Sequence, residues 1–389
     1  MKPDTNSLPN ILVVDDEPGI QRALTRILAR KYNPDAVGTG EEAIRKLVEK
    51  DYDVALVDLR MPGMDGFQLL RTIKLYRPQT EVIIMSGSAS EEKLIEAIQD
   101  QAFYFVTKPF QKEVIETLVE RCIWTQRLQR QNLAYTEQLE RYLEQAKEFQ
   151  ASLLPARFPA TPGVICGISY MPSEVLGGDF YDFFSVVGHT VAFVIADVFG
   201  HGVLAAMKTG IVKSLFAEAV RENSSPPSVL QTINKGMNRF RGDSPLTLFY
   251  GLLLLDEMSL WYANAGHPPP LLCRANGERQ RLDSSAPLLG AGIAVPDDAG
   301  RRVRLQPGET LVLYTDGVLE AMDSDRRWFG FDNLLRTVDE HLQGPPNLLA
   351  DEICRSVRRF ASGGLPLDDL TALVLRWEPS APAAWDAGI

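Results

Sequence analysis

Residues 112–153 contain no glycine and no proline and are rich in Glu, Gln, Arg and Leu. This length and composition favour one continuous helix. The chain has 389 residues, which is too long for one ordinary hydrophobic core and suits two or three domains. The sequence therefore predicts folded parts that are joined by a long helical connector.

The connector carries a heptad pattern, because its seam positions alternate spacings of four and three residues. These positions are Leu128, Asn132, Tyr135, Leu139, Tyr142, Ala146, Phe149 and Leu153. A buried Asn in such a seam tends to fix a paired, in-register state at some cost in stability. Two interpretations stay open, a parallel homodimer through this coiled-coil-like helix and a single amphipathic helix lying on its own domain.

Charge and composition limit the classes of partner that this protein could bind. The net charge of −11 argues against a nucleic-acid-binding surface and against adhesion to anionic lipid. The apolar runs are too short to span a bilayer, and the start of the chain is polar. The four cysteines form no Cys-x-x-Cys pair, as expected for reduced thiols. We therefore expect a cytoplasmic protein without nucleic-acid or membrane partners.

The first part of the chain alternates strand-like and helix-like segments. Strands are predicted at 11–14, 53–57, 81–85 and 103–106, with a weaker one near Ala36, and helices at 19–30, 41–50, 67–76 and 91–99. This rhythm predicts an α/β fold with a doubly wound, five-stranded parallel sheet. In such a sheet, functional groups collect at the carboxyl ends of the strands.

Chemically active residues stand at those strand ends. They are Asp15 and Asp16 after the first strand, Asp58 after the third in chain order, Ser86 after the fourth and Lys108 with Pro109 after the last. Asp and Ser commonly end strands and cap helices, so each alone would indicate only that. All of them at successive strand ends form a far more specific signal.

Residues 8–123 resemble the receiver domain of bacterial two-component response regulators. The resemblance implies that Asp58 accepts a phosphoryl group from a histidine kinase or phosphotransfer protein. It implies that Asp15, Asp16, Asp58 and the backbone carbonyl of Arg60 hold Mg²⁺, and that Pro109 follows a cis peptide. Ser86 would donate to the phosphoryl group and Lys108 would pair with it. Phe105 occupies a position that is often Tyr or Phe in this family.

The second part of the chain has runs of strands and runs of helices. Strands are predicted at 164–170, 180–186, 191–196, 247–255, 260–265, 270–273, 303–305, 310–314 and 370–377, and helices at 203–221, 227–241, 331–340 and 346–361. This order indicates an α+β sandwich of two sheets with helices outside. Aspartates follow or precede several strands, and gathered carboxylates repel one another unless cations lie between them. Two Mg²⁺ or Mn²⁺ ions in such a site form a common centre for phosphate ester hydrolysis.

Six motifs give residues 150–377 a resemblance to the SpoIIE-type branch of the metal-dependent protein phosphatases (PPM class). They are Gln-Ala-Ser-Leu-Leu-Pro (150–155), Gly-Gly-Asp-Phe-Tyr-Asp (177–182), Ala-Asp-Val-Phe-Gly-His-Gly (196–202), Tyr-Ala-Asn-Ala-Gly-His-Pro-Pro-Pro (262–270), Tyr-Thr-Asp-Gly-Val-Leu-Glu-Ala (314–321) and Asp-Asp-Leu-Thr (368–371). The resemblance implies an enzyme that removes phosphate from Ser or Thr of proteins.

The resemblance also assigns the metal ligands. Asp197 would bridge two Mn²⁺ or Mg²⁺ ions, the carbonyl of Val198 would help to hold one of them, and Asp316 and Asp368 would hold the other. Asp179 would orient a metal-bound water and belongs to the same metal-site residues. Asp369 and Asp182 each have two interpretations, as part of the metal site and as a structural hydrogen-bond partner.

Two features depart from a plain catalytic interpretation. Phe199 stands where the family usually has Ser, and no motif supplies an arginine that would clamp the substrate phosphate. His201 and His267 are candidate general acids, but a structural role in a Gly-flanked turn is the better prediction for both. The four histidines have no metal-ligand spacing, which disfavours zinc.

These patterns predict a response regulator in which phosphorylation of Asp58 controls a Ser/Thr phosphatase. The resemblance suggests a phosphorylated anti-anti-sigma (STAS-type) protein as substrate. The alternative is an adaptor that resembles the regulator of sigma S and binds a sigma factor for proteolysis. The predicted divisions are a receiver domain at 1–123, a helical linker at 124–153, a phosphatase domain at 154–377 and a disordered tail at 378–389. Phosphorylation is predicted to act through the connector on the helix after Gly202 and on Asp197.

Overall fold

A computed structural model describes residues 8–87, 104–200, 202–240, 245–361 and 368–378. The chain divides into two compact units, Met1–Leu139 and Glu140–Ile389, and each is described by itself. The domain boundaries predicted from the sequence treat the connecting helix as a separate segment, and they stay predictions. The helix predicted at 91–99 and the tail predicted from 378 lie, apart from Glu378, outside the described residues.

The first unit has a five-stranded parallel sheet in the order β2-β1-β3-β4-β5. Its strands are β1 (Asn10–Val14), β2 (Asn33–Val37), β3 (Val54–Asp58), β4 (Glu81–Ser86) and β5 (Tyr104–Thr107). The helices α1 (Pro18–Leu28), α2 (Gly40–Glu49) and α3 (Gly66–Tyr76) follow the first three strands in turn. The predicted α/β fold is confirmed.

Both faces of this sheet are buried, which explains why its strands are apolar throughout. Leu12 and Val57 point to one face and belong to the core that α2 and α3 cover. Ile11 and Leu56 point to the other face, where α1 and the start of α5 (Lys112–Leu153) pack. The α3 helix begins with a capping box between Asp65 and Gln68, which fixes its start just after the loop that follows β3.

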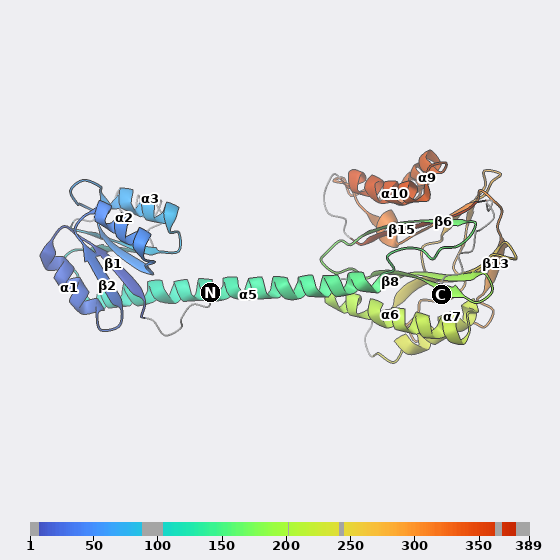
Figure 1. The fold of residues 1–389 in the computed structure, drawn as a ribbon, viewed down its shortest axis with the longest axis horizontal. Coiled ribbons are helices and arrows are strands. Elements are labelled where there is room, and N and C mark those ends of the chain that lie inside the picture. Colours follow the sequence, from blue (N-terminus) through green and yellow to red (C-terminus); the bar gives the residue numbers. More distant parts are fainter. Residues whose placement is uncertain (1–7, 88–103, 201, 241–244, 362–367, 379–389) are drawn as a thin grey trace. The chain divides into compact units, whose positions relative to one another are not determined.

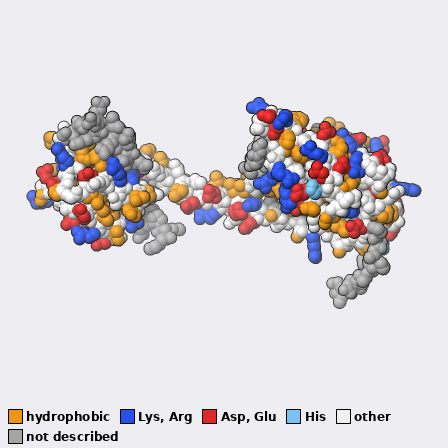
Figure 2. Space-filling view, turned by 90° about the horizontal axis from the view of Figure 1, so that it is seen from above, with side chains coloured by type: hydrophobic (Ala, Val, Ile, Leu, Met, Phe, Trp, Pro, Cys, Tyr) orange, Lys and Arg blue, Asp and Glu red, His pale blue; other side chains and the backbone are white. Residues whose placement is uncertain are grey.

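Helix α5 runs without interruption from Lys112 to Leu153, as the composition predicts (Figure 1). Its first turns bury Ile115, Val119 and Cys122 in the core of the first unit. The buried side chain of Gln126 then donates to the carbonyl of Gln79 at 2.6 Å. Further along α5, exposed hydrophobic side chains lie among acidic and basic ones (Figure 2).

The second unit contains two five-stranded sheets packed face to face. The first, in the order β13-β10-β9-β8-β7, is made of β13 (Arg301–Arg304), β10 (Ser259–Ala265), β9 (Leu246–Leu254), β8 (Thr190–Val198) and β7 (Asp179–Val186). The second, in the order β12-β11-β14-β15-β6, is made of β12 (Arg279–Arg281), β11 (Leu271–Cys273), β14 (Thr310–Tyr314), β15 (Leu370–Trp377) and β6 (Val164–Met171). Both sheets are antiparallel, so consecutive strands can pair directly.

Three hydrophobic cores separate four layers in this unit. Phe193, Phe249 and Leu373 fill the space between the two sheets. Outside the first sheet lie α6 (Val203–Glu222) and α7 (Pro226–Met237), and outside the second lie α9 (Gly330–His341) and α10 (Pro346–Phe360) (Figure 1). The predicted sandwich of two sheets flanked by helices is confirmed.

Some details of the second unit differ from the prediction. The short strand β12 and the five-residue helix α8 (Asp316–Glu320) were not predicted, because neither is long enough to show a period. Helix α7 ends at Met237 rather than at residue 241, since the amides of Arg239 and Phe240 bond to carbonyls only three residues back. Across the described residues, none of the helices combines the length and apolar character needed to cross a membrane.

Candidate functional site

Three aspartates meet at the carboxyl end of the first unit's sheet. Asp15, Asp16 and Asp58 each bring one carboxylate oxygen to within 4.8 Å of the others. Lys108 Nζ lies 2.7 Å from Asp15 Oδ2 and 2.9 Å from Asp58 Oδ1. Ser86 adjoins them, because its carbonyl accepts the Lys108 amide at 2.7 Å. The structure thus brings together the three aspartates and the lysine that the strand ends predict, and Ser86 adjoins them through its backbone.

The charges at this edge favour a bound cation. Burial raises the pKa of Asp15, and the hydrogen bond from Lys108 only partly opposes this. Burial lowers the pKa of Lys108, but its hydrogen bonds to Asp15 and Asp58 outweigh burial and raise the pKa overall. Three carboxylates around one ammonium leave negative charge in excess, and oxygen ligands of this kind suit Mg²⁺. The donor set therefore fits a Mg²⁺ ion.

The loop after β3 is packed tightly against Asp58. A Cβ atom at Gly66 would lie 2.4 Å from the Asp58 carbonyl oxygen, so no larger residue fits there without moving that strand end. Arg60 lies in this loop with an exposed side chain, and the metal-binding role of its carbonyl stays a prediction. The peptide between Lys108 and Pro109 is cis, as the resemblance implies.

The second unit gathers its acidic residues where the inner faces of the two sheets end. Asp179 on β7 lies directly opposite Asp197 on β8, and Asp197 lies opposite Thr247 on β9. Side chains alternate faces along a strand, so Asp197 continues the inward-facing series of residues 191, 193 and 195. Asp316 opens α8, two residues after β14, and Asp368 lies two residues before β15.

Two threonines, one on β15 and one just after β14, hydrogen-bond to Asp179. The hydroxyl of Thr315 donates to Asp179 Oδ2 at 2.8 Å, and the hydroxyl of Thr371 donates to the same oxygen. Asp179 is only 2% exposed, so these two bonds fix its carboxylate within the protein. Because both hydroxyls donate to Oδ2, the orientation of the Asp179 carboxylate is fixed.

Asp369 organises the backbone next to this site. Its Oδ1 accepts from the amide and hydroxyl of Ser173 at 2.7 and 3.0 Å. Its Oδ2 accepts from the amide of Gly178 at 2.5 Å. Both oxygens are engaged by the protein itself, which favours the structural interpretation of Asp369 over the ligand interpretation.

Mutual repulsion and burial make the acidic centre favour cations. Burial raises the pKa of Asp197 to about 8, with further contributions from the charges of Asp316 and Asp368. Burial also raises the pKa of Asp316 to about 6, helped by Asp368. The pKa of Asp179 is raised by burial and by Asp197, against the opposing hydroxyls. The ionised forms of these carboxylates are therefore unfavourable without a counter-charge, as expected at a site for hard divalent cations.

These carboxylates are more widely spaced than those of the first unit. Within the described part of the chain, the receiver-like trio is the one group of three acidic residues whose oxygens all lie within 4.8 Å. A site shared by two ions needs a wider ligand set than a site for one ion. Gly178 leaves room beside the Val198 carbonyl, since a Cβ there would lie 2.8 Å from that oxygen.

Two family models match the chain. The response regulator receiver domain matches residues 11–120, and the family of stage II sporulation protein E (SpoIIE) matches residues 187–378. The chain therefore joins a receiver domain to a SpoIIE-type phosphatase domain of the PPM class. The two resemblances that the sequence motifs suggested are confirmed.

Individual relatives agree with this assignment. Protein IcfG of Synechocystis sp. (strain ATCC 27184 / PCC 6803 / Kazusa) is 27% identical over 263 residues, which cover 60% of this chain and 41% of IcfG. The phosphoserine phosphatase RsbU of Bacillus subtilis (strain 168) is 26% identical over 242 residues, covering 62% of this chain and 71% of RsbU. The chain thus spans less than half the length of IcfG.

A solved structure shares the fold of the phosphatase domain. The SiaA-PP2C domain of Pseudomonas aeruginosa aligns with a TM-score of 0.57 at 22% sequence identity. The alignment covers 63% of this chain and 99% of that domain. At this identity the likeness shows the fold, and the roles of individual residues rest on the geometry described above.

Sequence motifs missed several residues that shape the phosphatase site. Thr315 and Thr371 lie inside quoted motifs, but nothing in a single sequence marks them as partners of Asp179. Gln150 lies in the first motif, and its side chain makes two hydrogen bonds to Gly177. Apart from its place at the start of the first motif, nothing in the sequence marks Gln150 as a partner of Gly177.

His267 is part of the domain's interior. It is 1% exposed, and its Nδ1 lies 2.8 Å from the hydroxyl of Thr247, the cross-strand neighbour of Asp197. Its Nε2 is the one buried side-chain nitrogen or oxygen in the described ranges with no hydrogen-bond partner. Burial lowers the pKa of His267 to about 3, so the imidazole is neutral at ordinary pH. This favours the structural role predicted for it, while His201 lies outside the described residues.

Two further predicted features have clear places. Phe199 is 49% exposed, and its amide donates to the carbonyl of Pro245. Its ring therefore lies at the surface, two residues beyond Asp197. Asp182 points to the opposite face of β7 from Asp179 and pairs with Lys213 of α6 at 2.6 Å. That contact favours the structural interpretation of Asp182.

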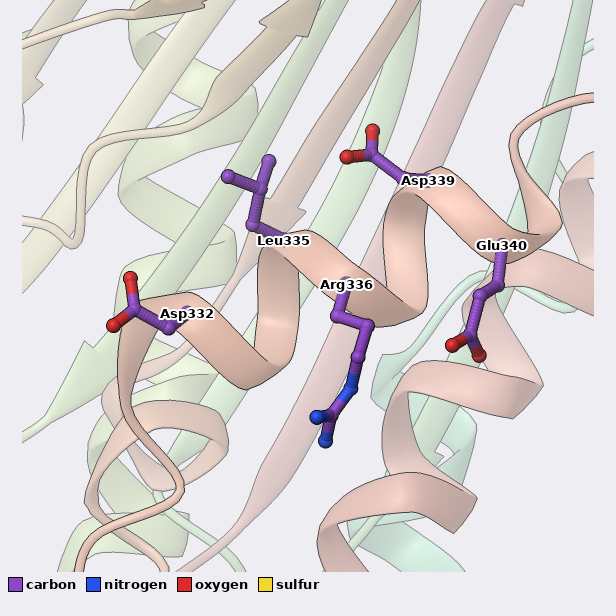
Figure 3. Close-up of a pocket in the computed structure, with 5 residues that line it drawn as sticks. All are labelled: Asp332, Leu335, Arg336, Asp339 and Glu340. Carbon is purple, nitrogen blue, oxygen red and sulfur yellow. The ribbon is translucent and has the colours of Figure 1, made fainter.

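A surface hollow of the second unit lies apart from this chemistry. It has a volume of about 600 Å³ and is lined by one face of α9, with Asp332, Leu335, Arg336, Asp339 and Glu340 (Figure 3). Figure 3 shows these side chains projecting from a single surface helix, and none of the site aspartates lines the hollow. We therefore assign no part of the phosphatase site to it.

Proposed function

We propose that this protein is a response regulator in which phosphorylation of Asp58 controls a metal-dependent phosphoserine/phosphothreonine protein phosphatase. The acidic centre of the phosphatase domain carries this proposal. Asp197 is buried and Asp316 is half-buried, and loss of solvent together with the neighbouring carboxylates raises the pKa of each. The charged forms that metal binding needs become favourable when divalent cations lie between them.

We assign the ligands of two Mn²⁺ or Mg²⁺ ions to Asp197, the carbonyl of Val198, Asp316 and Asp368. Such ions, when bound, supply an activated water and neutralise charge on the phosphate. Asp179 takes the role of orienting the water, and its buried threonine partners support this because they hold its carboxylate in one direction. Gly317 lets α8 approach the last strand, since a Cβ there would lie 2.1 Å from the Asp369 carbonyl.

In the receiver domain we assign the phosphoacceptor role to Asp58. Asp15, Asp16, Asp58 and the Arg60 carbonyl would hold Mg²⁺, which neutralises the incoming phosphoryl group. Lys108 already contacts Asp58 and can pair with a phosphoryl oxygen after a small movement. Ser86, at the neighbouring strand end, would donate its hydroxyl to the same group.

The proposed partners follow from the two domains. A histidine kinase or phosphotransfer protein would supply the phosphoryl group, and a phosphorylated anti-anti-sigma protein of the STAS type would be the substrate. The relative RsbU is a phosphoserine phosphatase, which supports phosphoserine as the target group. A phosphorelay of this kind operates in the cytoplasm, which is the location that we propose. A second copy of this chain would pair through α5.

Coupling between the domains is proposed to run through α5. Phosphorylation would shift an equilibrium of this helix and reposition α6 and the neighbouring Asp197. A contact at the end of α5 supports this route, because Leu153 Cδ1 lies 3.4 Å from where a Cβ of Gly210 on α6 would be. A movement of α5 therefore meets α6 directly.

The first test is hydrolysis of p-nitrophenyl phosphate by the full chain with Mn²⁺. We expect metal-dependent turnover that Asp197→Ala abolishes and that Asp256→Ala, a change at an exposed aspartate of the same domain, leaves intact. Equal rates in the wild type, Asp58→Ala and acetyl-phosphate-treated protein would contradict control by phosphorylation. No turnover under any of these conditions would favour the sigma-factor adaptor, which a pull-down would then test.

A further inference from the structure

The end of α5 is hydrogen-bonded to the loop that leads into the phosphatase site. The side-chain amide of Gln150 donates through Nε2 to the carbonyl of Gly177 at 2.6 Å. The amide of Gly177 donates back to Gln150 Oε1 at 3.1 Å. Gln150 is 6% exposed, whereas the three residues before it on the helix, 147–149, are exposed. Both polar ends of one buried side chain are thus committed to one residue of the loop.

Gly177 is also closely packed on the side that faces the site. A Cβ atom at Gly177 would lie 2.6 Å from both Asp369 Oδ2 and Tyr170 Oη, so the backbone itself is in close contact there. The next residue, Gly178, donates its amide to Asp369 and accepts from the Val198 amide at 3.2 Å. Because Gly177 and Gly178 are both held, the position of Gly177 fixes where the backbone of Asp179 lies.

The contacts that hold Gly177 and Gly178 come from two different parts of the chain, the sheets and α5. Asp369 and Val198 belong to strands or strand ends of the sandwich, and they hold Gly178 from within the folded sheets. Gln150 belongs to α5, the helix through which we propose that the receiver acts. Of the contacts described for Gly177 and Gly178, the Gln150 pair is the one that changes if the end of α5 shifts.

We propose that Gln150 is a positioning residue, which sets the geometry of Asp179 by holding Gly177, so that the seating of α5 determines how well the phosphatase site is formed. The proposal rests on the proposed phosphatase function and adds a specific route for its regulation. This route is separate from the contact of Leu153 with α6. A purely structural clamp would stabilise the domain without altering the Asp179 segment.

The test compares Gln150→Met with Gln145→Ala in the full chain. Met keeps the length of the side chain and removes both hydrogen bonds, while Gln145 is an exposed residue of the same type on the same helix. We expect Gln150→Met to lower kcat for p-nitrophenyl phosphate at saturating Mn²⁺ by about tenfold or more, with a KM within about twofold. Gln150→Glu keeps the acceptor for the Gly177 amide but places a carboxylate oxygen against the Gly177 carbonyl, so we expect it to lower kcat as well. Gln145→Ala should match the wild type.

A second readout does not require activity. In metal-free protein, we expect the amides of Gly178 and Asp179 to exchange hydrogen faster in Gln150→Met than in the wild type and in Gln145→Ala. Unchanged exchange in this segment would overturn the proposal, as would a kcat loss that only follows a lower folded fraction. If Gln150→Met does not fold, Gln150→Glu takes its place in both measurements. If the wild type shows no turnover, the phosphatase proposal fails, while the exchange result still decides the role of Gln150.

Discussion

At the scale of single residues, two hydroxyl groups orient a carboxylate of the phosphatase site. Asp179 receives hydrogen bonds from Thr315, which directly follows β14, and from Thr371 on the neighbouring strand β15. Residues that orient a ligand in this way commonly change metal affinity or activity by about 10- to 100-fold when they are lost. The direction of the Asp179 carboxylate thus depends on two hydroxyl groups outside the acidic cluster.

Removing one hydroxyl tests this dependence. Thr371→Val keeps the shape of the side chain and removes the donor to Asp179, so we expect about a tenfold loss of Mn²⁺-dependent turnover. Thr337→Val is the matched control, since Thr337 is a buried threonine of α9 whose hydroxyl donates to the helix carbonyl of Asn333. Steady-state assays with p-nitrophenyl phosphate provide the measurement. Equal losses in the two variants would show that the effect is one of general stability.

The raised pKa values of the site aspartates predict a dependence of metal binding on pH. Asp316 and Asp197, with pKa values of about 6 and about 8 without metal, must lose protons when cations bind. The apparent affinity for Mn²⁺ should therefore rise as pH increases from about 6 to about 8. Calorimetry in buffers of different ionisation enthalpy would report the released protons, and an affinity that is constant across this range would contradict the prediction.

The same shifts fix the sign of the stability change. A carboxyl whose folded-state pKa lies above its ordinary value of 3.8 contributes stability that is fully present below 3.8 and is lost as pH rises through the folded-state pKa. Metal-free phosphatase domain should therefore unfold at lower temperature at pH 8.5 than at pH 6. Mn²⁺ should reverse this difference, which thermal unfolding with and without a chelator can measure.

At the scale of elements, the sequence predicts where strands end better than which strands meet. The ends are visible because apolar runs stop at residues such as Asp58 and Asp197. The partners of Asp179 are not visible, since Thr315 lies 136 residues away and Thr371 lies 192 residues away. Their contact depends on the order β14-β15-β6 and on the stacking of two sheets. Short elements such as β12 also escaped prediction because they carry no period.

A close packing of elements in the receiver domain gives a further prediction. Gly66→Ala would force a Cβ against the Asp58 carbonyl, where it would lie 2.4 Å away, so we expect a loss of about 1–3 kcal/mol in the free energy of unfolding. Gly19→Ala, also at the start of a helix, meets no atom within 4 Å and should be neutral or slightly stabilising. Denaturant unfolding of the full chain, followed through its receiver transition, would compare the two variants. Similar effects at both positions would count against the packing argument.

At the scale of the whole molecule, α5 is continuous in sequence with both domains and leaves its heptad seam uncovered in a single chain. Tyr135, Leu139, Tyr142 and Phe149 are all more than half exposed. Large apolar side chains that repeat along one helical seam are expected to be covered by a partner, and a second copy of α5 supplies the matching pattern. Asn132, also exposed, would then lie in the seam and favour an in-register parallel pair.

Two leucines of α5 allow a matched test of this pairing. Leu139 lies in the seam and is 58% exposed, while Leu133 lies outside the seam and is 57% exposed. Because the two side chains are equally exposed in one chain, Leu139→Lys and Leu133→Lys should differ only if a partner covers the seam. We expect sedimentation to show a dimer for the wild type and Leu133→Lys, and a dissociation constant raised at least about tenfold by Leu139→Lys. A wild-type monomer at high concentration, with and without acetyl phosphate, would instead support a lone amphipathic helix. In that case the proposed signal from Asp58 would have to travel within one chain, through the contacts that the end of α5 makes with Gly177 and α6.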